Sequence, residues 1–149
     1  MALREMLQVL ERIEEIATLA GLRGRIDEEQ LRYEMGFGLE DGRSQVVYAR
    51  PIPGPTKTPV ITIFSPCLIK KKKGVFQGIS KKMALDLLRR NEKVVFARYG
   101  IADIKDGALV LASVDHLLET LDPPEFGASA YHVAVAADTY EREHGQDDF

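Results

Sequence analysis

Two Asp-Gly pairs constrain the fold most, because each lies between two segments with the pattern of a β-strand. The first pair, Asp41-Gly42, separates residues 31–37 from residues 45–52. The second pair, Asp106-Gly107, separates two apolar segments within residues 93–114. Asp-Gly favours the positive backbone angles of a tight hairpin turn. Strands joined by such turns run antiparallel, so we expect an antiparallel sheet.

Three helices are predicted from apolar residues that recur at helical spacing. The first stripe precedes Gly21 and Gly24, two candidate helix stops. It consists of Leu3, Met6, Leu7, Leu10, Ile13, Ala17 and Ala20. The second helix covers residues 81–91 after the candidate N-cap Ser80, and the third follows the candidate N-cap Asp122. The apolar stripe of the third consists of Phe126, Ala130, Val133, Ala134, Ala137 and Tyr140.

A further strand is predicted over residues 60–65, VITIFS, after a loop with four prolines in residues 51–59. Pro66 either ends this strand or marks a sheet edge, because proline has no N–H to donate. The order of elements is then helix, three strands, helix, two strands, helix. This order predicts an α+β fold, with an antiparallel curved sheet covered by helices. We expect one domain, residues 1–149, with a frayed tail at about residues 145–149.

Composition excludes several classes of protein. Hydrophobic residues make up 45% and charged residues 29% of the 149 residues, as in globular proteins. No apolar run approaches the ~20 residues that a membrane-spanning helix needs. The N-terminal segment lacks the basic start and uninterrupted apolar run of a signal peptide. We therefore expect a cytoplasmic protein that does not bind membranes.

The sequence contains no P-loop, nucleophile elbow or zinc-protease motif. The single cysteine, Cys67, is interpreted as a buried structural residue, because a nucleophile needs a nearby base. The best metal-like pattern is Glu141 with His144, which we interpret as a surface pair because it occurs once. We therefore expect no catalytic residue, no metal site and no cofactor, and we predict that the protein is not an enzyme.

A basic segment is the strongest candidate for a functional surface. Residues 70–98 contain ten Lys or Arg residues and two acids, whereas residues 115–149 contain nine acids and one base. The cations singled out are Lys70, Lys71, Lys72, Lys73, Lys82, Arg89 and Arg90. They form a phosphate-binding patch, a rim for a protein partner or a solvated strand end. The net charge of −3 and the absence of a reader motif disfavour nucleic acid. Whether the basic segment contacts the acidic one is left open.

Residues 84–117 resemble the central segment of YbjN-like proteins, small bacterial proteins with relatives of the type III secretion chaperone-like fold. The last helix looks like the final helix of the family. The matching features are Leu87, Leu88, Asn91, Tyr99-Gly100, Asp106-Gly107 and Ala137-Asp138-x-Tyr140. The resemblance implies an α+β domain that dimerises and has no catalytic site. In secretion chaperones, apolar grooves hold an extended segment of a client protein.

We therefore predict a protein-binding adaptor or chaperone-like regulator that forms a homodimer and binds a protein client. Met83, Leu87 and Leu88 share one face of the second helix and are candidates for an association surface; the same three residues suit the core equally well. Two alternatives remain. One is a nucleic-acid-associated protein that uses residues 70–98, and the other is an enzyme centred on Cys67.

Overall fold

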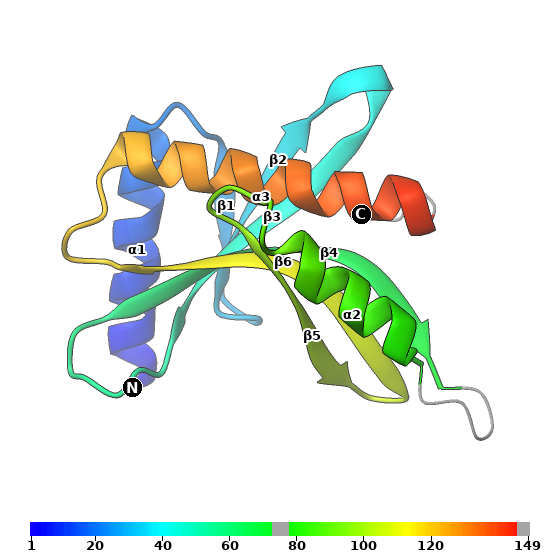
Figure 1. Cartoon of the computed structure of the whole chain (residues 1–149). Coiled ribbons are helices and arrows are strands. Elements are labelled where there is room, and N and C mark those ends of the chain that lie inside the picture. The colour runs from blue at the N-terminus through cyan, green and yellow to red at the C-terminus, as the bar shows by residue number, and fades with distance from the viewer. Residues whose placement is uncertain (73–77, 146–149) are drawn as a thin grey trace.

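The computed structural model describes residues 1–72 and 78–145, which form three helices and a six-stranded sheet (Figure 1). The helices are α1 (Leu3–Leu19), α2 (Lys81–Arg90) and α3 (Pro123–His144). The strands are β1 (Gly24–Asp27), β2 (Arg32–Gly38), β3 (Ser44–Ile52), β4 (Val60–Lys71), β5 (Arg98–Ile104) and β6 (Gly107–Leu117). The sheet order is β1-β2-β3-β4-β6-β5, and all neighbours are antiparallel. The predicted α+β fold with an antiparallel sheet is confirmed.

Strand β1 is absent from the predicted order. It is four residues long, its first two residues are exposed, and Ile26 is its one aliphatic side chain, so its apolar pattern is too weak to recognise. Gly24 opens this strand instead of stopping the first helix. A Cβ at Gly24 would lie 2.3 Å from the Glu34 carbonyl oxygen, so the close approach of β1 to β2 requires glycine here.

The predicted helices are confirmed together with their boundaries. The Ser80 hydroxyl accepts a hydrogen bond from the Met83 amide at 3.1 Å, and the Asp122 carboxylate accepts one from the Glu125 amide at 2.8 Å. Gly21 ends α1 with a φ of +78°. All six residues of the predicted third stripe are fully buried. Within the described ranges, no helix is long and apolar enough to cross a membrane.

Strand β4 continues through Pro66, so the alternative that Pro66 ends the strand is wrong. A β-bulge between Pro66 and Leu68 accommodates the proline. Strand β3 pairs with β4 only as far as Phe64, so the stretch around Pro66 has β6 as its one sheet neighbour among the described residues. Proline is tolerated there because no second strand needs its missing N–H.

Strand β5 begins at Arg98, five residues later than the sequence pattern predicts. Phe96 adopts a left-handed φ of +62°, which breaks an extended strand. The side chain of Asn91 replaces the missing strand partner at the start of β5: its Oδ1 accepts from the Tyr99 amide at 2.7 Å and its Nδ2 donates to the Tyr99 carbonyl at 3.1 Å. Residues 93–97 therefore form a loop beside α3.

The sheet has a covered and an uncovered face. Opposite residues of an antiparallel pair share a face. The core residues of β2, β3 and β4 are Tyr33, Met35, Val47, Ala49, Ile61 and Ile63, all on the face toward α1 and α3. Helix α2 lies on the same side, since its Arg90 guanidinium is 5.1 Å from the ring centroid of Tyr140 in α3. The alternate residues, such as Tyr48 and Phe64, lie on the uncovered face.

Candidate functional site

Helix α3 is apolar on its outer side as well as on its buried side. Its outer row consists of Tyr131, Val135 and Thr139, which are four residues apart and lie above one another on a helix. Tyr131 is 53% and Val135 is 38% exposed. A surface helix normally presents a charged or polar outer face to solvent. The outer row is therefore an exposed, uncharged and largely apolar surface, in which the Thr139 hydroxyl donates back to the Val135 carbonyl.

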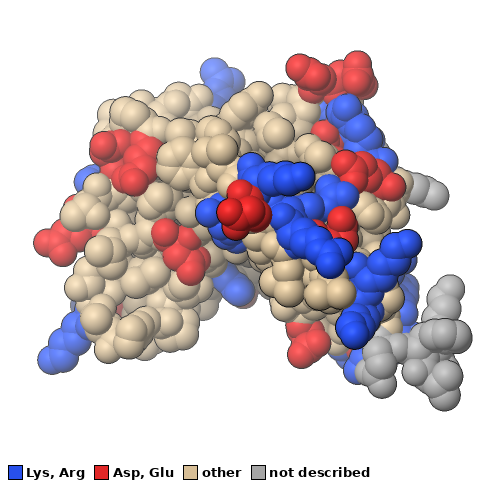
Figure 2. All heavy atoms as spheres, in the orientation of Figure 1, with Lys and Arg blue, Asp and Glu red and all other residues tan. Residues whose placement is uncertain are grey.

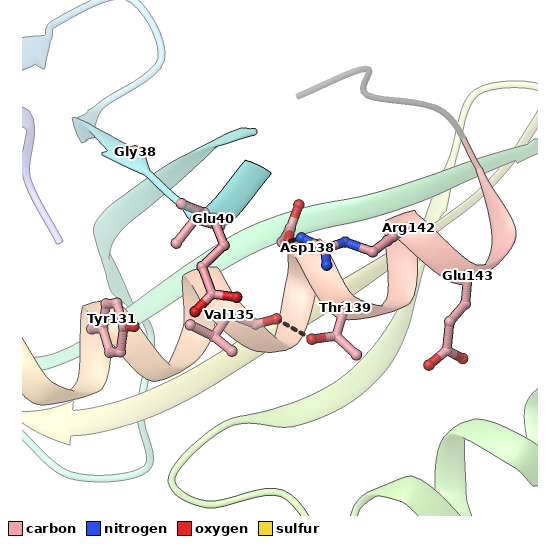
Figure 3. Close-up of a pocket in the computed structure, with 9 residues that line it drawn as sticks. Gly38, Glu40, Tyr131, Val135, Asp138, Thr139, Arg142 and Glu143 are labelled. Carbon is pink, nitrogen blue, oxygen red and sulfur yellow. Dashed lines mark hydrogen bonds and ion pairs between the residues drawn. The ribbon is translucent and has the colours of Figure 1, made fainter. Parts of the chain in front are cut away.

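A first hollow lies between the outer row and the β2–β3 turn (Figure 3). It has a volume of about 490 Å³ and is lined by Gly38, Leu39, Glu40, Asp138, Arg142, Glu143 and the outer row. Figure 3 shows the Glu40 side chain reaching from the turn toward α3. The hollow thus combines apolar side chains such as Leu39 and Val135 with three carboxylates and the Arg142 guanidinium.

Arg43 holds the β2–β3 turn against α3. Its Nε donates to the Asp138 carboxylate at 2.6 Å, and its Nη2 lies 3.8 Å from Glu141 Oε2. The three side chains are 18%, 7% and 1% exposed, so water screens their attraction only weakly. Arg142 adds a bond to Asp138 at 3.2 Å and an ion pair to Asp41 at 3.7 Å. These contacts fix the wall of the first hollow.

A second hollow lies on the other side of the outer row, beside the loop of residues 93–97. It has a volume of about 360 Å³, and its lining includes Lys93, Val94, Val95 and His132 together with the outer row. Val95 is 60% and Phe96 is 44% exposed, and the Phe96 ring lies 5.1 Å from the His132 ring. The outer row is therefore flanked by two concave regions that can each receive a side chain.

The two flanks of the outer row carry opposite charge. Three acids, Glu40, Asp138 and Glu143, and one base, Arg142, line the first hollow, whereas Lys93 lines the second. Figure 2 shows this face: the surface over the middle of α3 is largely uncharged, while Lys and Arg side chains gather over α2 and the segment after it. A partner with the complementary charge on each side would be oriented along the row.

Among the described residues, Arg90 forms the one ion pair between the basic segment and the acidic one. Its guanidinium donates to the Glu143 carboxylate and to Asp86 at 2.7 Å. The hydrogen bond from Arg90 lowers the pKa of Glu143 below its usual value. Arg90 therefore links α2 to α3. Lys82 and Arg89 are exposed on α2.

The lysine run lies at one end of the sheet. Lys70 and Lys71 pair with β6 at the end of β4, and the Lys72 amide donates to the Asp106 carbonyl of the β5–β6 turn at 2.9 Å. This turn adds Lys105, which the sequence pattern did not single out. Lys73 lies outside the described residues. The prediction of a charged strand end agrees with this placement for Lys70 to Lys72.

The three candidate association residues of α2 differ in their exposure to solvent. Leu87 is 3% exposed and belongs to the core, and Met83 is partly buried against it. Leu88 is 66% exposed and lies one helical turn from Leu85, which is 39% exposed. The core interpretation holds for Leu87, and Leu88 is available for association.

The residues considered for catalysis or metal binding do not form a common site. Cys67 is fully buried, and burial raises the pKa of its thiol, so it is protonated at neutral pH. Glu141 is 1% exposed, so its interpretation as a surface residue is wrong: α3 turns it toward Arg43. His144 instead stacks on Tyr140 with ring centroids 4.1 Å apart. Within residues 1–72 and 78–145, no group of three His, Cys, Asp or Glu side chains is placed to hold a metal ion.

Sequence reasoning missed the outer row. The signal is present, because Tyr131 and Val135 repeat at i, i+4 beside the predicted buried stripe. Comparison of the chain with known protein families and with curated proteins finds no match.

Proposed function

We propose that the protein is a binding adaptor whose outer row on α3 docks a segment of a partner protein. The observation that supports this most is the apolar row itself, with a hollow on each side and opposite charges on its flanks. Side chains of a partner would anchor in the hollows, as in helix-in-groove recognition. The charged flanks would set the direction of the segment.

The surface is suited to a few dominant contacts. Aromatic residues in an interface commonly contribute much of the binding energy, and Tyr131 is the aromatic residue of the outer row. Truncation of one such anchor weakens binding by about 2 kcal/mol or more, which is about thirtyfold. The Arg43 contacts keep the β2–β3 turn in place before binding, so a partner would not have to order it.

A substitution within the outer row tests this function. Wild-type protein and the Val135→Asp variant are used to capture proteins from a native, nuclease-treated lysate. Leu19→Asp is the matched control, because Leu19 is 73% exposed on α1, outside the proposed surface. We expect a discrete protein that wild type and the control retain and that Val135→Asp loses. Equal capture by all three, with equal far-ultraviolet circular dichroism, would argue against the outer row.

The homodimer stays a prediction, supported by the exposed pair Leu85 and Leu88 on α2. Light scattering tests it: wild type is expected to have twice the chain mass of 16.6 kDa, and Leu88→Asp the mass of one chain. A wild-type mass near 16.6 kDa across micromolar concentrations would remove the dimer. The YbjN-like resemblance supports this proposal, and it adds no site residue of its own.

A further inference from the structure

The uncovered face of the sheet carries a cross-strand row of aromatic and charged residues. The register places Tyr48 of β3 beside Phe64 of β4. The whole row, across all six strands, is Arg25, Glu34, Tyr48, Phe64, Ser113 and Arg98. The helices pack on the other side of the sheet, so this aromatic row is spatially separate from the outer row of α3.

Arginines lie against both rings of the aromatic row. The Tyr48 and Phe64 ring centroids are 5.3 Å apart, with ring planes tilted by 35°. The Arg32 guanidinium carbon is 4.0 Å from the Tyr48 centroid, and that of Arg50 is 5.2 Å from the Phe64 centroid. Arg32 is fixed in this position by two hydrogen bonds to Glu34, at 2.9 and 3.2 Å. The result is a set of flat groups held side by side on central strands.

The charges on this face leave arginines free for an anion. Arg25 and Arg32 both pair with Glu34, and Arg32 also lies 3.8 Å from Asp27. Among the described residues, Arg50 makes no ion pair, and Arg98 donates only to the backbone carbonyls of Val94 and Ala97. Asp115 is the remaining acid of the face, two residues along β6 from Ser113 of the row.

This combination fits single-stranded nucleic acid better than an apolar protein surface. Bases stack on aromatic rings and on guanidinium planes, and phosphates pair with arginine. An apolar partner would instead have to desolvate the guanidinium groups that lie over both rings, which is unfavourable. If the arginine side chains only shielded the two rings from water, this face would bind no oligonucleotide.

We propose that the aromatic row binds single-stranded nucleic acid, with bases stacked on Phe64 and on the Arg32–Tyr48 pair. Arg50 and Arg98 contact the adjacent phosphates. The bound strand uses two to four cations rather than a long basic groove, so its affinity is modest and only moderately salt-dependent. The site is distinct from the lysine run at the end of β4 and does not depend on the adaptor function.

Fluorescence anisotropy with labelled oligouridylate and oligothymidylate of about eight nucleotides tests the proposal, because such sites cover about 4–16 nucleotides. Binding is measured at several salt concentrations. Phe64→Leu, which removes the ring and keeps an apolar side chain, is expected to weaken binding about tenfold or more. Arg50→Gln is expected to reduce the salt slope by about 0.7, the value for one phosphate contact on a single strand.

Three controls decide between this site and its alternatives. Inorganic polyphosphate, which has phosphates and no bases, should compete poorly if stacking contributes. The double variant Lys71→Ala and Lys72→Ala should retain binding. If the double variant loses binding and Phe64→Leu retains it, the site lies at the lysine run and the proposal is overturned. Val135→Asp should bind the oligonucleotides like wild type. Absence of wild-type binding to both oligonucleotides at low salt would also overturn it, whatever the capture experiment shows.

Discussion

Replacement of Arg43 with methionine is expected to destabilise the protein more than any surface substitution. The variant leaves Asp138 and Glu141 buried without this cation. Removal of one partner of a buried ion pair costs about 3–5 kcal/mol. Asp138 keeps its bond to Arg142 at 3.2 Å, so the cost should be near the lower end, about 3 kcal/mol. For a chain of this length, that corresponds to a fall in Tm of about 6–12 °C.

Urea denaturation of wild type and Arg43→Met measures this cost as the change in the free energy of unfolding. The control is the triple variant Arg43→Met, Asp138→Asn and Glu141→Gln, which removes the buried charges together. Replacement of a whole buried ion pair by uncharged residues is often neutral, so this variant should recover much of the lost stability. A change below about 0.5 kcal/mol for Arg43→Met, or no recovery in the triple variant, would refute the buried-cluster reasoning.

Three further outcomes are expected. Burial raises the pKa of Tyr99 from 10.0 to about 12. Between these pH values the folded state keeps a proton that the unfolded state has lost, so the free energy of unfolding should fall as pH rises from 10 to 12. The variant Tyr99→Phe should show a smaller fall. Cys67 should react with a thiol reagent only on unfolding, and rapid alkylation of the native protein would contradict its complete burial. Asp122→Ala should cost about 1 kcal/mol in urea denaturation, and Asp122→Asn much less, because asparagine also caps helices.

Local signals account for the parts of the fold that the sequence predicts. The stripe from Phe126 to Tyr140 repeats at the helical period, and Asp122 caps the start of the same helix by accepting a bond from the amide three residues later. The Asp-Gly turns act within a few residues in the same way, since Asp41 and Gly42 both have positive φ. Such features need no knowledge of distant contacts.

The remaining features depend on partners far apart in the sequence. Strand β1 is extended because β2 pairs with it. Residues 93–97 form a loop because the Asn91 side chain bonds to the backbone of Tyr99 and so fixes the chain where β5 begins. Arg43 and Asp138 are 95 residues apart, so their ion pair is invisible in a local pattern. The aromatic row depends on the register of six strands, and a slip of one residue would move its side chains to the other face.

Site-specific photo-crosslinking tests the central claim about the outer row of α3 most directly. A photoreactive amino acid replaces Tyr131 in one variant and Leu19 in another, and both are irradiated in native, nuclease-treated lysate. We predict a discrete crosslinked protein from position 131 and none from position 19. The same crosslinks from both positions, or none from position 131 in a folded variant, would contradict the assignment of this surface to a protein partner.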